Sequence, residues 1–443
     1  MIEKGSGERG TRLSQSPSPS AYRSWQARTG LFLFGQTVSL FGSSLVQYAI
    51  VWYITLTTSS GLMMTISTLC GFLPQIAISL FAGVWADRFN RKFLIMLSDS
   101  LIAASTLILA LLFLAGYQQL WLLFLISAIR SAGAGVQTPA VNALIPQLVP
   151  PDKLMRVNGI NGSMQSLTMI VSPAVAGWIL SVVGMNLSPV LFIDLATAVV
   201  GVGLLGLLRV PRLPRAETAA GPLRDLRNGV SYVLGHRFLR MLLVVYAVLM
   251  FLITPAAMLT PLMIERTYGD EVWRLTWNEV LFSLGSVIGG ILIAAWGGFR
   301  NRIHTIVLAG AVFGVMTVLM GVLPGFVVYL VLVFLTGISM PFFNSPSIVL
   351  LQEKVEPEMQ GRVFSFVQIV GSAALPLGMV VFGPLADLVG RVQILLIVTG
   401  IGILILSGLI LRCRTLVAEG RPSGNSSPDP GMSMPEEASQ PEE

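Results

Sequence analysis

The stretch that decides the fold reads Gly83-Val84-Trp85-Ala86-Asp87-Arg88-Phe89-Asn90-Arg91-Lys92. It places four formal charges and one glycine between two apolar runs, each about 20 residues long or more. Runs of that length are typical of membrane-spanning helices, so the charged stretch is predicted to be a turn between two spans. Basic charge alone is common in such turns. The ordered spacing of Gly, Asp-Arg and Arg-Lys is more specific.

Composition excludes a soluble protein. Of 443 residues, 54% are hydrophobic and only 11% are charged, whereas a soluble domain carries roughly 25% charged residues. Apolar runs recur from Gly30 to Leu411, and each is predicted to be helical because lipid cannot satisfy free backbone groups. The twelve predicted spans are 30–55, 63–86, 93–115, 120–142, 159–184, 189–209, 238–263, 277–297, 304–323, 326–349, 364–389 and 392–411.

The placement of lysine and arginine predicts the orientation. If both termini are cytoplasmic, the inside loops and tails hold 24 of the 28 basic residues. Three lie in outside loops (Arg266, Arg274 and Arg391), and Arg130 lies within a span. This asymmetry predicts a multi-pass protein with both termini in the cytoplasm. The net charge of +6 therefore follows from topology and gives no reason to expect a nucleic-acid partner.

The chain divides into five predicted regions. Residues 1–29 and 412–443 are rich in Ser, Pro, Gly and Glu at their outer ends and are predicted to be disordered cytoplasmic tails. Six spans occupy residues 30–209 and six occupy residues 238–411. Between them, residues 210–237 form a basic linker predicted to contain a short amphipathic helix on the inner surface. The two cysteines, Cys70 and Cys413, give no reason to expect a disulfide.

The two six-span halves echo each other in sequence. Three groups of residues recur at slowly drifting offsets, which indicates a duplication and two pseudo-symmetric halves. The pairs are Trp85, Asn90 and Arg91 with Trp296, Asn301 and Arg302; Gln137 and Pro139 with Asn344 and Pro346; and Arg156, Gly177 and Gly184 with Arg362, Gly383 and Gly390.

The charged turn between the second and third spans resembles the signature loop of the major facilitator superfamily of secondary transporters. A second stretch narrows the resemblance within this superfamily. Residues 139–159 look like the helix 4–5 connection of macrolide-efflux-type and enterobactin-exporter-type proteins. The resemblance covers essentially all twelve spans. It implies an all-α membrane fold in two six-helix halves and a bacterial inner-membrane exporter driven by proton antiport. The implied substrates are small amphipathic compounds of the drug, macrolide or siderophore type, and the implied unit is a monomer in membrane lipid.

Three charged residues within the spans are the candidates for proton coupling: Arg130, Asp194 and Asp99. A charge at a helix centre is costly, so it faces the protein interior and usually has a function. Asp99 and Asp194 are taken as the intramembrane acids well away from span ends, and Asp194 is ranked first because it lies nearer the outer side. The alternative is structural. Arg130 would then be an anchor to carbonyl groups or to an aspartate, and either acid would make a helix-packing hydrogen bond or, for Asp99, be a partner of the charged turn.

Polar residues that share helix faces are predicted to line a substrate cavity, although such residues also serve as interhelical hydrogen-bonding partners. These candidates are Gln36, Ser43, Gln47, Gln137, Asn161, Gln165, Thr168, Asn344 and Gln368.

The charged turn itself has a mechanical interpretation. Asp87 can accept hydrogen bonds from the N-terminus of a neighbouring helix, and such a latch would favour the outward-facing state. The predicted latch comprises Gly83, Asp87, Arg88, Arg91 and Lys92. In the second half, Gly298 and Phe299 replace the Asp-Arg pair, so one half alone carries the full set.

The sequence predicts no enzyme. It contains no phosphate-binding loop and no metal-ligand cluster, and its two histidines (His236 and His304) lie near helix ends. No cofactor is therefore expected, and an ion or substrate gradient must supply the energy. Two other hypotheses remain: a lysophospholipid flippase on the same fold, and a membrane sensor or scaffold that transports nothing.

Overall fold

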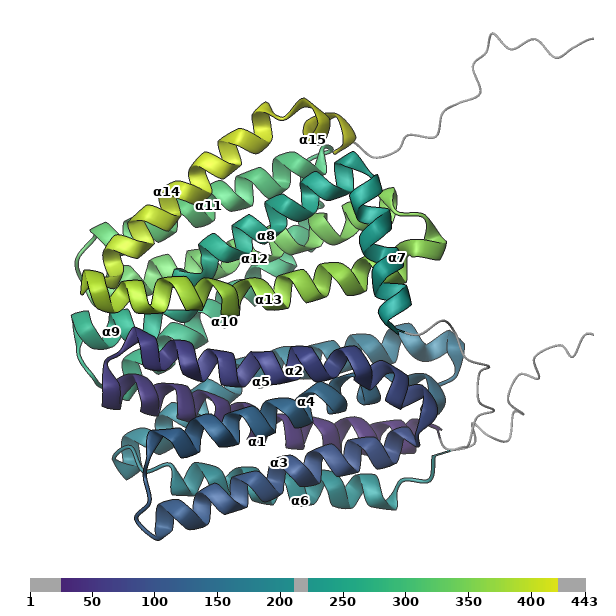
Figure 1. Cartoon of the computed structure of the whole chain (residues 1–443), viewed down its shortest axis with the longest axis vertical. Helices are drawn as coiled ribbons and strands as arrows, with labels where there is room; N and C mark the ends of the chain where they lie inside the picture. The colour runs from purple at the N-terminus through teal and green to yellow at the C-terminus, as the bar shows by residue number, and fades with distance from the viewer. Residues whose placement is uncertain (1–24, 211–221, 421–443) are drawn as a thin grey trace, which may run out of the picture.

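The computed structural model describes residues 25–210 and 222–420, without the side chains of residues 84, 87 and 222–226. The regular structure in these ranges is helical (Figure 1). The elements are α1 (Trp25–Thr58), α2 (Gly61–Arg88), α3 (Arg91–Leu114), α4 (Leu120–Leu148), a 3₁₀ turn (Pro151–Lys153), α5 (Leu154–Val183), α6 (Ser188–Leu207), α7 (Pro222–Gly235), α8 (Arg237–Met258), α9 (Thr260–Tyr268), α10 (Val272–Trp296), α11 (Arg302–Val322), α12 (Phe326–Lys354), α13 (Pro357–Val389), α14 (Val392–Arg412) and α15 (Arg414–Glu419).

The prediction of twelve spans is confirmed, because twelve segments of the described chain are long and apolar enough to cross a membrane. Several helices are longer than their apolar runs. For example, α12 continues to Lys354 and α13 begins at Pro357, where spans were predicted to end at 349 and begin at 364. Hydropathy marks the part of a helix that faces lipid, whereas backbone hydrogen bonding carries the helix on into its polar ends.

The seventh span is broken where a single helix, 238–263, was expected. Helix α8 ends at Met258 and α9 begins at Thr260, so Pro261 lies in the first turn of α9. A proline there is tolerated because the backbone N–H that it lacks would have no partner inside the helix. The two pieces together still make one candidate span, Arg237–Tyr268.

Both predicted tails contain helical residues at their inner ends. Helix α1 begins at Trp25, inside the region 1–29, and α15 lies inside the region 412–443. The outer parts of both tails, residues 1–24 and 421–443, lie outside the described residues, as does the linker segment 211–221. The amphipathic helix expected in the linker is present as α7.

The helices form two bundles that lie one above the other in Figure 1, α1–α6 below and α8–α14 above. The same pairs of helices pack in each bundle. As α2 packs on α4 and α3 on α6, so α10 packs on α12 and α11 on α14. The bundles meet mainly through two crossings, α2 on α13 and α5 on α10. The two crossings are equivalent, because α2 corresponds to α10 and α5 corresponds to α13 in the two halves. This arrangement agrees with the duplication inferred from the sequence.

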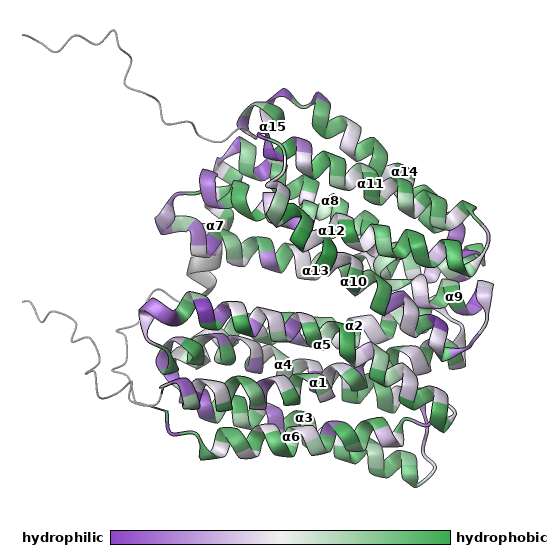
Figure 2. Cartoon of the chain, turned by 180° about the vertical axis from the view of Figure 1, so that it is seen from behind, coloured by the Kyte–Doolittle hydropathy of each residue, from purple (hydrophilic) through white to green (hydrophobic). Residues whose placement is uncertain are grey.

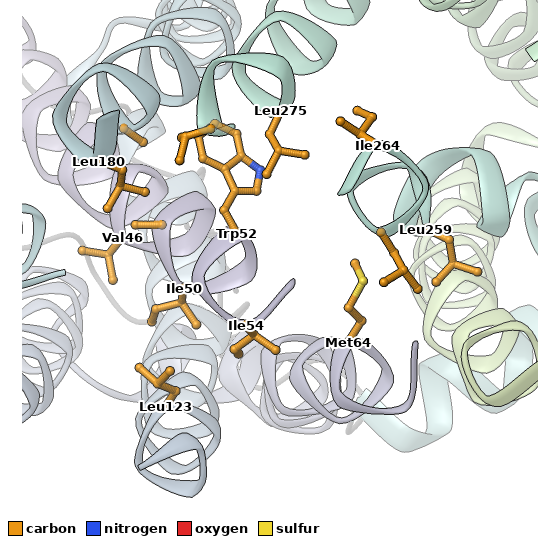
Figure 3. Packing of buried hydrophobic residues seen from close by; sticks show 14 of the residues in the cluster. Val46, Ile50, Trp52, Ile54, Met64, Leu123, Leu180, Leu259, Ile264 and Leu275 are labelled. Carbon is orange, nitrogen blue, oxygen red and sulfur yellow. The ribbon is translucent and has the colours of Figure 1, made fainter. Parts of the chain in front are cut away.

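The core is shared between the halves at one end of the molecule only. We call the end near Trp25 and Gly420 the terminal end and the opposite end the distal end. One large buried cluster contains residues of both halves, and its members lie towards the distal end. In Figure 3, Trp52 of α1 lies beside Leu275 of α10, and Met64 of α2 faces Leu259. Towards the terminal end, each half has a separate cluster of its own. The halves are therefore joined distally and separate at the terminal end.

Hydrophobic and hydrophilic residues are separated along the helices. Figure 2 shows green, hydrophobic residues along the length of the helices and purple, hydrophilic residues gathered around α7, α15 and the turns. In the apolar stretches of α2 and α10, only 11% and 17% of the residues are buried inside the protein, whereas 50% are buried in that of α11. Each of these two helices takes part in a crossing between the halves. Their low burial agrees with halves that are separate on the terminal side of the crossings.

The repeated residues have the same local role in both halves. Asn90 and Asn301 accept hydrogen bonds from the first backbone N–H groups of α3 and α11, as N-cap residues do. Gly177 and Gly383 lie at the two crossings, where a Cβ atom would collide with Thr276 and Thr65 respectively. Only glycine allows the helices of the two halves to approach so closely.

Candidate functional site

A buried ion pair joins four helices inside the first half. Arg130 of α4 donates to Asp194 of α6 at 2.5 Å, and their side chains are 7% and 1% exposed. Thr106 of α3 accepts from Arg130 and donates to Asp194 at 2.9 Å. The Arg130 guanidinium also donates to the Ser43 carbonyl of α1 at 3.3 Å. Two of the predicted coupling residues thus bind each other directly, and Ser43 contacts both.

A close approach of two helices makes room for this pair. Gly42 of α1 lies against α6, where a Cβ atom would meet the Asp194 backbone at 3.0 Å and collide with Thr197. Breaking a buried pair leaves an uncompensated charge and costs about 3–5 kcal/mol. The pair therefore holds the helices of the first half together and depends on the charge of both residues.

Asp99, the third predicted coupling residue, occupies a separate buried position nearer the terminal end. Its Oδ1 accepts from the Gln137 amide of α4, and the amide of Gln36 in α1 faces the same carboxyl group. The Asp99 side chain is 2% exposed, and its Oδ2 has no hydrogen-bond partner. It forms no ion pair with a described residue. Asp99 therefore joins α1, α3 and α4 without a cation to balance it.

A second polar cluster fastens the two halves at the distal end. Asp387, in the last turn of α13, accepts from the backbone N–H groups of Gly61 and Leu62 at 2.7 and 2.9 Å. It also accepts from Ser60 at 2.9 Å and from Arg266 at 2.7 Å. The carboxylate thus caps the N-terminus of α2, where the helix dipole favours negative charge. We call Asp387, Arg266 and Ser60 the distal latch.

The basic residues of the signature turn bind within their own half. Arg91 donates to the carbonyl groups of Ala86 and Ala143 at 2.9 and 2.7 Å. Lys92 donates to the carbonyl groups of Gly206 and Leu208, at the C-terminal end of α6, at 2.7 and 2.8 Å. Both side chains therefore satisfy carbonyl groups at the terminal ends of helices.

The other residues of the predicted latch give less information. Arg88 is exposed, and a Cβ atom at Gly83 would meet nothing within 4 Å. The side chain of Asp87 lies outside the described residues, so the proposed bond between this carboxylate and a neighbouring helix stays a prediction.

The equivalent turn of the second half is fastened differently. Asn301 donates to the Val417 carbonyl at 2.8 Å, and the Arg302 backbone N–H donates to the Gly420 carbonyl at 2.9 Å. Arg302 also pairs with Glu353 at 3.0 Å. Helix α15 thus supplies the contacts that basic residues supply in the first half.

The predicted cavity residues fall into two groups by exposure. Gln36 and Thr168 are buried in the first half, and Ser43, Gln137 and Asn161 are partly buried. The exposed members are Gln47, Gln165, Asn344 and Gln368. Gln47 stays exposed although α1 packs against α2, α4, α5, α6 and α9. Its amide lies beside Gly71 of α2, where a Cβ atom would approach Nε2 to 3.5 Å.

Glu279 is the acidic residue that the sequence reasoning missed. A span was predicted to begin at 277, which put Glu279 at its edge, but α10 begins at Val272 and places it in the second turn. Its Oε1 accepts from Asn278 at 3.3 Å, and Asn278 in turn accepts from Tyr329 at 2.6 Å. The cap residue Glu271 and the polar run that follows it hid the true start of the helix from hydropathy. The statement that Asp99 and Asp194 are the intramembrane acids is thereby corrected.

No group of three or more His, Cys, Asp or Glu side chains within the described residues could hold a metal ion. The arrangement can bind and release protons or ligands at carboxylates and can change shape at the crossings. These features are those of a multi-span membrane protein with charged groups buried between its helices.

Comparison with known proteins gives the family. The family model described as Major Facilitator Superfamily matches residues 32–379. The chain belongs to the major facilitator superfamily, and it is a non-enzymatic, multi-pass bacterial membrane transporter.

Its curated relatives include efflux proteins. Macrolide efflux protein A of Streptococcus pyogenes is 33% identical over 375 residues, which cover 83% of this chain and 92% of the relative. The protein of the same name from Enterococcus faecalis is 33% identical over 70% of this chain and 97% of its own length. The multidrug efflux pump Tap of Mycolicibacterium fortuitum is 25% identical over 81% of this chain and 89% of its own. These relatives support an efflux transporter.

Solved structures agree on the fold. The nucleoside transporter NupG superposes with a TM-score of 0.67 at 14% identity and covers 88% of this chain and 99% of its own. A bacterial homolog of the human lysosomal transporter Spinster gives a TM-score of 0.65 at 15% identity, over 92% and 100% of the two chains.

Proposed function

We propose that this protein exports small amphipathic compounds, macrolides among them, from the bacterial cytoplasm by proton antiport with alternating access. The observation that carries the proposal is the core that is shared between the halves distally and divided at the terminal end. The relatives named for macrolide and multidrug efflux supply the direction and the substrate class.

Alternating access needs two arrangements of the halves around a fixed site. In the arrangement described above, the distal latch and the crossings at Gly177 and Gly383 close one end. The exposed polar side chains of Gln47 and Gln165 are proposed to line the space that opens at the other end. Releasing substrate would require the distal contacts to part and the terminal ends to close.

The terminal end is proposed to be cytoplasmic. The loops and tails at that end hold 24 of the 28 basic residues of the chain, as the positive-inside rule requires. The structure is then open to the cytoplasm. Labelling with an impermeant thiol reagent tests this in a chain without Cys70 and Cys413. A cysteine at the exposed position Glu271 should react in intact cells, and one at the exposed position Asp152 should not.

Proton coupling is proposed to act through Arg130 and Asp194. A proton that neutralises Asp194 weakens its hold on Arg130, and Arg130 also contacts α1 through the Ser43 carbonyl. Helix α1 borders the other half through α9. A change of protonation in the first half can therefore reach the interface through one packed helix. Asp99 is the second candidate for this role.

The decisive experiment is efflux from a pump-deficient bacterial strain, with a panel of macrolides, siderophores and lipophilic dyes, with and without an uncoupler. Uphill efflux that the uncoupler abolishes supports the proposal. Uphill efflux that an uncoupler leaves intact overturns proton coupling. Movement of labelled lysophospholipid into spheroplasts without drug efflux would favour the flippase, and no flux of any compound would favour a sensor.

A further inference from the structure

Glu279 lies one helical turn inside the seal that closes the distal end. Helix α1 runs towards the distal end, so Tyr48 is one turn before Trp52. Helix α10 runs the opposite way, so Glu279 is one turn after Leu275. Trp52 and Leu275 lie side by side in the shared core (Figure 3). The same geometry stacks Tyr48 and Glu279 beneath them, at the inner limit of the closed end.

This register brings the Glu279 carboxylate within electrostatic range of the Tyr48 hydroxyl in the first half, and of the Tyr329 hydroxyl in its own half. Its carboxylate accepts a hydrogen bond of 3.3 Å from the Asn278 amide. None of the ion pairs among the described residues involves Glu279. Its charge therefore faces aromatic and amide groups without a basic counterpart.

The other two intramembrane acids differ from it in access. Asp194 is 1% exposed and is already paired with Arg130, and Asp99 is 2% exposed within the first half. Glu279 is only partly buried and borders both halves. Of these three acids, Glu279 is therefore the one that is neither enclosed within the first half nor held by a cation among the described residues.

We propose that Glu279 binds the protonated amine of a lipophilic cationic substrate, with Tyr48 and Phe282 as the aromatic wall beside it. The inference rests on the proposed export function and adds the chemical group that is recognised and the residue that recognises it. Phe282 lies one turn from Glu279 on α10 and is partly buried against the shared core. A carboxylate with aromatic neighbours suits an organic ammonium ion, which gains from both the charge and the ring faces.

The recognition has a consequence for transport. While the distal end is closed, the amine would sit directly beneath Trp52 and Leu275. Opening that end separates α1 from α10 and removes Tyr48 from the carboxylate. The bound cation would then lose part of its site on the side where it is released, which is the direction an exporter requires.

The test uses the full-length protein in lipid nanodiscs and two probes of nearly the same shape. One is a 14-membered macrolide with a dimethylamino sugar, and the other is its N-demethyl, N-acetyl derivative, which carries no positive charge. We expect Glu279→Gln to weaken binding of the amine by about tenfold to a hundredfold and binding of the neutral derivative by less than about twofold. Glu358→Gln removes an exposed carboxylate at the terminal end and is the matched control, for which neither affinity should change.

Three outcomes would overturn the inference. If Glu279→Gln leaves both affinities unchanged, the amine is recognised elsewhere while the export function stands. If it weakens both probes equally in protein that elutes normally on size exclusion, Glu279 supports the fold or the coupling instead. If the wild-type protein binds neither probe, macrolide export itself fails together with this inference. A Glu279→Asp variant, which keeps the charge, should retain preference for the amine over the neutral probe.

Discussion

The two halves of this transporter share a scaffold and differ in their interior charges. The first half encloses a buried ion pair, Arg130 with Asp194, together with the buried carboxyl group of Asp99, which forms no ion pair with a described residue. In the second half, Glu279 lies in the second turn of α10, and none of the ion pairs among the described residues involves it. Among the repeated residues, Asn90 and Asn301 cap helices and Gly177 and Gly383 allow the close crossings, so this part of the duplication fixes how helices pack. The interior charges differ between the halves. We infer a division of labour, with coupling in the first half and recognition at the second.

The largest expected effect comes from Asp194→Asn. The substitution keeps the size and most hydrogen bonds of the side chain but leaves Arg130 buried without a counter-charge, at a cost of about 3–5 kcal/mol. We expect uphill efflux to be abolished while downhill substrate exchange persists. The measurement is substrate accumulation with an imposed proton gradient against exchange without one, in proteoliposomes.

The double variant Arg130→Gln with Asp194→Asn sharpens this result. It removes both charges, so it should regain much of the thermal stability that Asp194→Asn loses, without regaining uphill transport. Asp152→Asn, at an exposed loop position, serves as the control. Uphill pumping by Asp194→Asn that remains sensitive to an uncoupler would make the pair a packing element, and the contrast between the halves would disappear.

The two crossings between the halves give the next effect in size. At the crossing of α13 with α2, Asp387 binds two backbone N–H groups and Arg266. The equivalent position at the crossing of α5 with α10 is Ser181, whose hydroxyl donates to the Gly177 carbonyl of its own helix. Only one crossing therefore carries a charged latch. Because Asp387 and Arg266 are 30% and 20% exposed, solvent screens part of the interaction.

Asp387→Asn should therefore shift the population towards states open at the distal end by about threefold to tenfold. The readout is the rate at which a maleimide reacts with a cysteine at Met64, which is 3% exposed in the shared core. The chain used must lack its two native cysteines. Ser181→Ala is the matched variant and should leave the rate unchanged. Equal acceleration by both variants, or by neither, would show that the latch does not bias the two states.

A third pair of variants compares the two N-caps. Asn90→Ala and Asn301→Ala should each lower the free energy of unfolding by about 1 kcal/mol, because each removes a cap from the next helix. The loss at Asn301 should be the larger, since its amide also donates to Val417 of α15. Thermal unfolding in detergent measures both. A larger loss at Asn90 would mean that α15 contributes nothing to holding this turn.

The sequence predicted the number of spans, the linker helix and the duplication, because these depend on apolar length and on repeated glycine and cap residues. It also grouped Arg130, Asp194 and Asp99 as candidates, because a charge within a span is costly, and the structure pairs the first two of them. It missed Glu279, because hydropathy located the lipid-facing part of α10 and not its polar first turns. The distal latch was equally hidden. Asp387 lies at a helix end, where a charge has a small cost, and its partners are about 120 and 325 residues away.

The smallest effect is expected at the contact between α15 and the rest of the second half. Lys354 pairs with Glu419 at 2.7 Å, but the two side chains are 17% and 49% exposed. An exposed pair of this kind contributes about 0.2–1 kcal/mol before screening. Two hydrogen bonds that do not depend on that charge also fix the position of α15. The Arg302 backbone N–H donates to the Gly420 carbonyl, and the Asn301 amide donates to the Val417 carbonyl. Glu419→Gln should therefore change the melting temperature by no more than about 1–2 °C, and added salt should reduce the difference further.

A loss as large as that of Asn301→Ala would show that the ion pair, and not the backbone contacts, holds α15 against the turn. The second half would then fasten its turn by charge, as the first half does with Arg91 and Lys92.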